Sequence, residues 1–536
     1  MMKKNFKIGK YLIIFIYAFL AYYIMLPAIN LKNPEFYGYL FSVGFFSFII
    51  NLSFSLDLKK ANFDFKPKTK VLKYLSIFGL LFIGSILVIN LINTPIFNSK
   101  AYARRIEVKK DKTFTEDVKQ VNFKALPLLD KDSSQKLGDR VMGQLPELVS
   151  QFTVSNLYTQ INYNDEILRV TPLEYASWIK YFTNNKEGVK GYITVNSVSG
   201  EANLTKLDKG MKIMPSALFG NDLKRYVRFK YPTLIFGDFS FEIDNSGKPY
   251  WIIPIVDYVG VGLRKNIVGI IEVDPVNGET KKYETKDVPA WIDHVYSADL
   301  IIDQFDDYGR YQNGWWNSLF GQKGVVQTTD GYNYTVMNDD VYLYTGVTSI
   351  SSDEANLGFI LTNLRTKETN FYPVPGAEEY SAMASAEGQV QQMKYTSSFP
   401  LLINLNNRPT YLISLKDNAG LVKMYAFVDV VDYQKVVVSD ASLGIEKSAD
   451  RFLNSFIPSE DKTEKNTLTI TISNIKTGVV EGNTYYYLLD KNNKKYRASL
   501  KLGEGILPFL KADDKLQIVI RSRSDLTEIV EIIHEK

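Results

Sequence analysis

Three long apolar runs open the chain and set its first structural pattern. They carry no charged residue and cover Tyr11–Leu31, Phe36–Leu56 and Tyr74–Phe97. A helix of about 20 apolar residues spans the hydrocarbon core of a bilayer. The pattern therefore predicts three transmembrane helices rather than a cleaved leader, because two further runs follow the first. Residues 1–98 are predicted to form the membrane anchor.

The lysines around these runs predict the orientation. Lysines are concentrated at the N-terminus and in the loop between the second and third runs. The loop between the first two runs contains only Lys32 and Glu35 as charged residues. The positive-inside rule places lysine-rich segments in the cytoplasm. We therefore predict a multi-pass cell-membrane protein whose N-terminus is cytoplasmic and whose large C-terminal region lies outside the cytoplasm.

Beyond residue 98, an alternating pattern of apolar and polar residues occurs four times. Each occurrence predicts a strand, a short turn and a second strand, at Gly191–Leu204, Gly269–Tyr283, Gly358–Tyr372 and Tyr425–Val438. The turns contain residues suited to a tight reversal, such as Asn277 and Gly278. The last three occurrences also have a strand before them, so antiparallel sheets are expected.

Helical periodicity follows two of these hairpins. The segment from Pro289 to Gly309 predicts one amphipathic helix, because its apolar residues recur at three- and four-residue steps and Gly309 suits a helix end. These apolar residues are Trp291, Val295, Ala298, Ile302 and Phe305. A second helix of this kind is predicted to begin at Ser442. Both are expected to pack on the sheets.

The C-terminal segment has a different pattern. Five strands are predicted from Thr467 onwards, with a short helical turn at Gly505–Leu510 between the third and the fourth. This arrangement resembles an OB-fold barrel. Residues 464–536 hold 12 Lys/Arg and 10 Asp/Glu, counted from the sequence. Nucleic-acid binding is not predicted, because it needs a strongly basic groove.

The hairpin "VDPVNGETKKY" at Val273–Tyr283 resembles the PepSY domain. The resemblance extends from Tyr226 to Ile457, although the hairpin at Tyr425–Val438 lacks the turn glycine, and it implies an extracytoplasmic module associated with peptidase inhibition or regulation at the envelope. The whole chain also resembles a family of large membrane-anchored proteins of Gram-positive bacteria. The expected fold class is α+β, divided into a transmembrane anchor, a first extracytoplasmic α+β region, central PepSY-like units, a last PepSY-like unit and an OB-like barrel. Their ranges are 1–98, 99–225, 226–395, 396–458 and 459–536.

Composition narrows the possible chemistry. The chain of 536 residues is 45% hydrophobic and 23% charged, which is typical of a folded protein. It contains no cysteine, which excludes disulfides, thiol nucleophiles and cysteine-based zinc sites. Its two histidines, His294 and His534, do not suffice for a multi-histidine metal site, and His294 is expected on a helix surface. No cofactor is predicted.

Three acids on the helix after the second hairpin are weak candidates for a cation site. Asp303, Asp306 and Asp307 supply the hard oxygen ligands that calcium prefers. A solvated charged face is the alternative.

Two groups of residues are candidates for binding. Trp315, Trp316 and Phe320 lie in "QNGWWNSLFGQKG" and could pack between copies, contact a partner or touch the membrane. Thr345, Thr348, Ser349 and Glu387 could line a groove for a peptide or glycan. Close packing is the alternative for the second group, since the helix around Glu387 is rich in small residues.

These observations predict a binding or scaffold protein of the cell envelope rather than an enzyme, because no constellation of activated groups is visible. The expected partners are other envelope or membrane proteins and cell-wall polymer, and self-association is left open. The alternative is a cell-wall hydrolase or a regulator of an envelope peptidase. Transport is disfavoured, because the centres of the apolar runs contain no Asp, Glu, Lys, Arg or His, the residues that usually mark an ion or substrate path.

Overall fold

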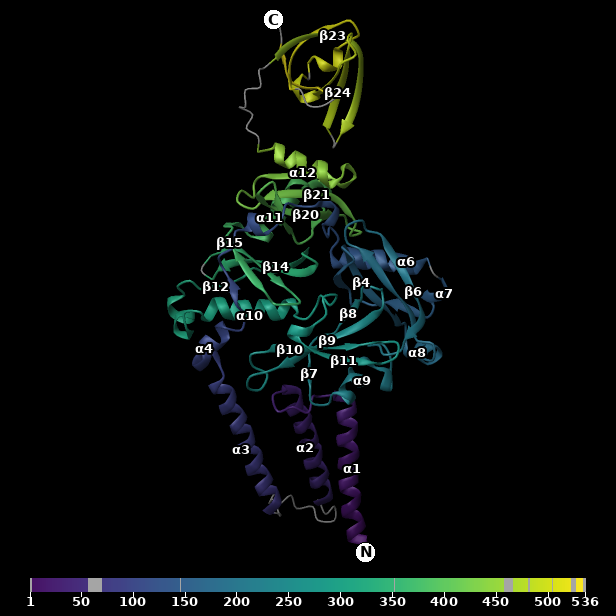
Figure 1. Cartoon of the computed structure of the whole chain (residues 1–536), viewed down its shortest axis with the longest axis vertical. Helices are drawn as coiled ribbons and strands as arrows, with labels where there is room; N and C mark the ends of the chain where they lie inside the picture. The colour runs from purple at the N-terminus through teal and green to yellow at the C-terminus, as the bar shows by residue number, and fades with distance from the viewer. Residues whose placement is uncertain are drawn as a thin grey trace, which may run out of the picture. The chain divides into compact units, whose positions relative to one another are not determined.

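The structure is a computed structural model (Figure 1). It describes residues 2–55, 70–144, 146–350, 352–456, 466–480, 483–503, 505–521 and 527–533. The chain divides into two compact parts, Met1–Ala441 and Ser442–Lys536. The lysine-rich loop after the second apolar run and His534 lie outside the described residues.

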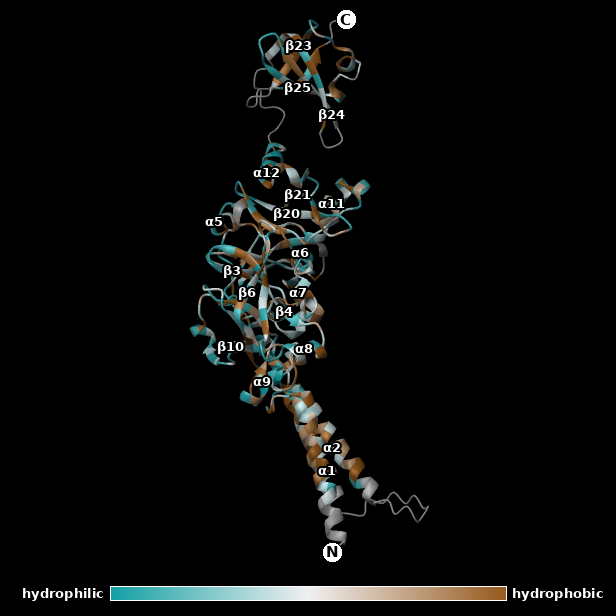
Figure 2. Cartoon of the chain, turned by 90° about the vertical axis from the view of Figure 1, so that its right-hand side faces the viewer, coloured by the Kyte–Doolittle hydropathy of each residue, from teal (hydrophilic) through white to brown (hydrophobic). Residues whose placement is uncertain are grey.

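Helices form over all three apolar runs. They are α1 (Met2–Met25), α2 (Pro34–Ser55) and α3 (Lys70–Ile92), and the shorter α4 (Pro95–Ala103) follows. Figure 2 shows hydrophobic residues along α1 and α2, and many of these side chains are exposed. Among the described residues, no single helix is both long and apolar enough to cross a membrane. Gly79–Ile92 and Pro95–Ala103 meet that criterion only together, with a 51° bend between them, and Gly9–Met25 is a shorter apolar helix.

Four antiparallel sheets follow, and each contains five strands in the same chain order. The first comprises β2 (Phe152–Val154), β3 (Thr159–Tyr163), β4 (Glu166–Tyr175), β5 (Val189–Asn196) and β6 (Ala202–Met211). The second comprises β7 (Ile235–Phe236), β8 (Ser240–Ile243), β9 (Pro249–Asp257), β10 (Asn266–Val273) and β11 (Thr280–Glu284).

The third and fourth sheets repeat this arrangement. The third comprises β12 (Val326–Thr328), β13 (Asn333–Met337), β14 (Asp340–Ser349), β15 (Ser352–Asn363) and β16 (Thr369–Tyr372), to which β1 (Val108–Lys109) and β17 (Gly376–Ala377) add. The fourth comprises β18 (Thr396–Ser397), β19 (Leu401–Leu405), β20 (Arg408–Lys416), β21 (Val422–Asp429) and β22 (Val436–Asp440). The four predicted hairpins are therefore the last two strands of each sheet.

In every sheet one strand pairs with three others. Strands β4, β9, β14 and β20 each pair with the two strands before them and with the strand after them. A helix precedes each sheet in the chain: α6 (Lys131–Gly143), α9 (Leu223–Lys230), α10 (Ala298–Tyr311) and α11 (Glu379–Gln389). We call each helix with its following sheet a copy, so that the copies cover 131–211, 223–284, 298–372 and 379–440.

Helix α10 is shorter than the periodicity predicts. It begins at Ala298, where the Ser297 side chain caps it by accepting a hydrogen bond from the Leu300 N–H. The preceding residues 288–297 are not helical, although Ile292 and Val295 are fully buried. Gly309 lies inside the helix instead of at its end. The apolar periodicity therefore continued through a buried irregular segment, which local pattern alone does not distinguish from a helix.

Side chains from neighbouring copies share the cores. The first core joins the first two sheets and includes Trp251, whose indole N–H donates to the carbonyl of Ile213 at 3.0 Å. A second core contains Ile301 of α10 with residues of the second and third sheets. A third joins the third and fourth sheets around Tyr344 and Tyr411. The copies therefore depend on one another for burial.

The segment before α6 runs across three copies. Strand β1 pairs in parallel with β16 of the third copy. The N–H of Val121 then donates to the carbonyl of Asn404 in the fourth copy, and the N–H of Leu129 donates to Ser197 in the first. These backbone bonds hold together parts of the chain that are far apart in sequence.

The C-terminal part contains α12 (Ile445–Asn454) and a closed barrel. The barrel strands are β23 (Asn466–Val480), β24 (Asn483–Asp490), β25 (Lys495–Ser499), β26 (Lys515–Arg521) and β27 (Thr527–Ile533). They close in the order β23-β24-β25-β27-β26 around a core that includes Ile472 and Ile518. The five strands predicted for this segment are confirmed.

Candidate functional site

An exposed aromatic cluster follows α10. Trp316 is 68% exposed, Leu319 51% and Phe320 77%, while Trp315 is half-buried. We call these four residues the aromatic platform. The interpretation that the tryptophans are packed between copies is wrong for Trp316. Large exposed apolar groups that lie together are typical of interaction surfaces.

The backbone of this segment is held by its own side chains. Gly314 adopts a φ of +89°, and a single π-helical turn covers Asn317–Gly321. The Ser318 hydroxyl donates to the Trp315 carbonyl at 2.6 Å, and the side-chain amides of Asn313 and Asn317 donate to the Lys323 carbonyl at 2.9 and 3.0 Å. These bonds join residues within the segment 313–323 and so hold the loop in shape.

The rings of the platform contact one another, edge-on between Trp315 and Trp316 and stacked between Trp316 and Phe320. The centroids of Trp315 and Trp316 are 4.7 Å apart with planes at 74°, and those of Trp316 and Phe320 are 5.8 Å apart with planes at 17°. Such contacts favour one ring arrangement over others. The platform is therefore a preformed apolar surface.

The second predicted group does not form an open groove. Thr345 and Thr348 of β14 are 0% and 3% exposed, and the Thr345 hydroxyl donates to the Gly331 carbonyl at 2.9 Å. Ser349 is half-buried at the end of the same strand. Glu387 of α11 accepts hydrogen bonds from the N–H and hydroxyl of Ser397 at 2.8 and 2.7 Å. Burial and internal bonding thus support the close-packing alternative for the threonines and for Glu387.

The three acids of α10 bind protein groups. Arg105, from the segment before α6, pairs with Asp303 at 2.8 Å and with Asp307. Burial raises the pKa of Asp307 to about 6, although the hydrogen bond from Arg105 opposes that rise. Asp306 accepts from the N–H and hydroxyl of Thr328 at 2.8 and 3.1 Å. The part of the chain that the structure describes contains no group of three or more metal-binding side chains.

His294 lies in the irregular segment before α10, not on a helix surface. Its Nε2 is 2.6 Å from the Gln160 carbonyl, and its ring meets the Tyr334 ring edge-on. The neighbouring N–H of Asp293 donates to Glu242 at 2.8 Å. Burial, followed by the charge of Glu242, raises the pKa of Asp293 well above its usual value.

Sequence analysis did not single out Glu242, Asp293 and Glu379, which are among the buried carboxyl groups of the described residues. Glu242 and Glu379 are 0% exposed and Asp293 is 1% exposed. The Glu379 carboxylate accepts from the Thr329 hydroxyl at 2.9 Å. Burial raises the pKa of Glu379 to about 7, and hydrogen bonds from backbone groups and Thr329 offset only part of that rise. The position of Glu242 between the apolar residues Phe241 and Ile243 was the feature of the sequence that could have indicated its burial.

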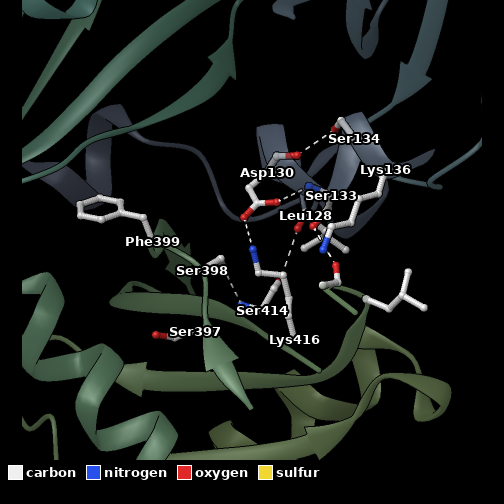
Figure 3. Close-up of polar contacts among 12 residues, drawn as sticks. Leu128, Asp130, Ser133, Ser134, Lys136, Ser397, Ser398, Phe399, Ser414 and Lys416 are labelled. Atoms are coloured by element: carbon white, nitrogen blue, oxygen red, sulfur yellow. Dashed lines mark hydrogen bonds and ion pairs between the residues drawn. The ribbon is translucent and has the colours of Figure 1, made fainter. Parts of the chain in front are cut away.

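A polar contact region joins the first copy to the fourth (Figure 3). Asp130 caps α6 by accepting from the Ser133 N–H at 2.9 Å, and it forms an ion pair with Lys416 of β20. Beside it, the Ser414 hydroxyl donates to the Leu128 carbonyl at 3.1 Å. We call the pair Asp130–Lys416 the clasp. Burial alone would raise the pKa of Asp130, but hydrogen bonds from Lys416 and Ser133 outweigh it and lower that pKa.

Comparison with known proteins identifies no family for this chain. No family model matches the chain, and no curated protein matches it. One solved structure, described as the crystal structure of an ACO/RPE65 chimera, aligns with 71% of this chain at 9% identity and a TM-score of 0.14. The alignment spans 65% of the chimera, just under two thirds of its length.

Proposed function

We propose that this protein is a membrane-anchored binding or scaffold protein of the cell envelope, and that the aromatic platform contacts a partner. The observation that carries the proposal is the exposure of Trp316 and Phe320 on a loop held by its own hydrogen bonds. Tryptophan and aromatic neighbours on a rigid surface contribute much of the binding energy at protein interfaces. A partner protein is therefore the preferred ligand, and cell-wall polymer is the other candidate.

The apolar helices support the proposed anchor. The N–H of Ile29, just after α1, donates to the Pro232 carbonyl at 2.8 Å. Asn90 of α3 accepts from the Val261 N–H at 2.8 Å and donates to its carbonyl at 3.2 Å. The helices thus end against the second copy, while their long exposed faces remain apolar. We propose that α1, α2 and α3 cross the cell membrane with the sheets outside the cytoplasm.

The repeated sheets support a scaffold of PepSY-like copies. Four copies share cores and strand order, which suits a rigid support for a binding surface. We propose that the C-terminal barrel is OB-like and serves a second protein contact, since its five strands carry a short helical turn, Leu507–Phe509, between β25 and β26.

Photo-crosslinking in native membranes tests the platform. Benzoylphenylalanine in place of Phe320 is expected to give discrete crosslinked proteins, which Trp316→Ser should abolish. The matched control places the same group at Val431, which is 68% exposed on the fourth copy. Absence of crosslinks at Phe320, or identical products at both positions, would count against the platform. Incubation of the protein with peptidoglycan separates the alternatives, because cleavage would favour a wall hydrolase.

A further inference from the structure

A second exposed apolar surface lies on the first copy. Helix α8 (Trp178–Asn184) turns Trp178, Ile179 and Phe182 outward, with 65%, 53% and 52% exposure, and Phe219 nearby is 57% exposed. We call these four residues the α8 edge. The Phe182 ring is 6.3 Å from Trp178 and 6.2 Å from Phe219, so the surface is continuous.

The edge is held in place from beneath. Tyr181, on the inner side of α8, is buried and its hydroxyl donates to the Leu218 carbonyl at 3.0 Å. Phe219 itself has a φ of +55°, in the left-handed region that bulky side chains seldom adopt. The fold thus retains a strained backbone at a residue whose side chain is exposed, which is common at functional surfaces.

The α8 edge adjoins the end of α1. Arg225 of α9 donates to the Phe219 carbonyl at 2.9 Å, and its guanidinium lies 4.3 Å from the centre of the Tyr23 ring. Phe229 of α9 packs near Tyr22 and Tyr23, with ring centroids 6.0 and 6.1 Å apart. Both views place α8 and α9 at the end of the sheet region from which α1 extends (Figures 1 and 2).

Exposed lysines lie on or next to these segments: Lys186 follows α8, next to the exposed Glu187, Lys212 follows β6, and Lys224 and Lys230 belong to α9. The acid between Phe219 and Lys230 is Asp222, whose side chain caps α9. Tryptophan and phenylalanine beside lysines are typical of surfaces that lie in the interfacial layer of a membrane containing anionic lipids.

We propose that the α8 edge inserts into the headgroup layer of the bilayer that α1, α2 and α3 cross, with anionic phospholipid as its ligand. The inference rests on the proposed anchor. A second contact beside the helix ends would restrict rocking of the sheet region, so that the aromatic platform is held in one orientation toward its partner.

Single spin labels test the insertion. The chain contains no cysteine, so Phe182→Cys gives one labelling site in the full protein. In phosphatidylcholine vesicles with phosphatidylglycerol, a label at this site is expected to be more accessible to oxygen than to a water-soluble nickel complex. A label at Phe320→Cys should be more accessible to the nickel complex than to oxygen. A label at Leu80→Cys, on the exposed apolar face of α3, tests whether that helix lies in lipid. Trp178→Cys provides a second label on the same edge.

The outcomes separate the two proposals. If the Leu80→Cys label is accessible to nickel, the anchor is wrong. If that label lies in lipid while both edge labels are accessible to nickel, only the insertion of the α8 edge is overturned. Edge labels shielded from both reagents would also overturn it, because a protein surface, such as a second copy of the chain, would then cover the edge. Omission of phosphatidylglycerol is expected to reduce the depth of both edge labels.

Discussion

Lys416 of β20 forms an ion pair with Asp130, the residue that caps α6, and so connects the fourth copy to the first. The Lys416 side chain is 12% exposed and the Asp130 side chain 29% exposed. A pair at this depth is weakly screened, and loss of one partner leaves the other charge poorly solvated. The clasp therefore joins parts of the chain almost 300 residues apart through one helix cap.

Removal of the clasp is expected to destabilise the protein. Asp130→Ala loses both the helix cap and the ion pair, so the free energy of unfolding should fall by about 2–3 kcal/mol. Lys109→Met is the control, because the Lys109–Glu368 pair is about half exposed and exposed ion pairs contribute little to stability. Denaturant unfolding of the full chain measures both. Equal losses for the two variants would contradict a structural role for the clasp.

Glu379 is expected to make stability depend on pH. The pKa of Glu379 in the folded protein is about 7, above its usual 4.5. Its contribution to the free energy of unfolding is therefore fully present below pH 4.5 and is lost as the pH rises through 7. Glu379→Gln should remove this dependence and stabilise the protein at pH 8 by on the order of 2 kcal/mol, since a tenfold change in acidity corresponds to about 1.4 kcal/mol.

Unfolding at pH 5 and pH 8 measures this effect. The exposed Glu107 provides the control, and Glu107→Gln should leave the difference between the two pH values unchanged. A Glu379→Gln variant that keeps the full pH dependence would show that another group is responsible.

The aromatic platform is expected to contribute to binding and not to folding. Trp316→Ser combined with Phe320→Ser should change the free energy of unfolding by less than about 0.5 kcal/mol, because both side chains are exposed. Partner capture should be lost. Trp251→Phe is the opposite control, since Trp251 is 0% exposed and its loss of packing and of one hydrogen bond should cost about 2–4 kcal/mol. A large stability loss in the platform variant would instead indicate a packing role.

Two helical glycines should respond oppositely to alanine. A Cβ at Gly309 of α10 would lie 2.1 Å from the Val326 carbonyl oxygen, whereas a Cβ at Gly388 of α11 meets nothing within 4 Å. Gly388→Ala should therefore stabilise by about 0.5–1 kcal/mol through helix propensity. Gly309→Ala should destabilise by about 2 kcal/mol or more, because α10 must move away from β12. Thermal melting compares the two, and stabilisation by Gly309→Ala would disprove the close approach.

Some of this architecture was predictable from local pattern. The hairpin at Gly269–Tyr283 could be predicted, because the alternation of apolar and polar residues and the Asn277-Gly278 turn depend on residues adjacent in sequence. The presence of helix α10 could be predicted but its start could not, because residues 288–297 include the buried Ile292 and Val295 without being helical. The acids Asp303 and Asp307 looked solvated or metal-binding, because nothing near them in sequence indicates that Arg105 approaches from about 200 residues away.

By itself, the sequence determined the mixture of strands and helices, the four repeated hairpins and the five barrel strands, because these depend on periodicity over a few neighbouring residues. Tertiary structure alone decided that Thr345 is buried while Trp316 is exposed, and that Gly309 serves close packing. It also decided that Asp130 meets Lys416. Exposure, close approach and ion pairing depend on which distant segments lie opposite each residue, and that information is absent from the order of residues within any short window.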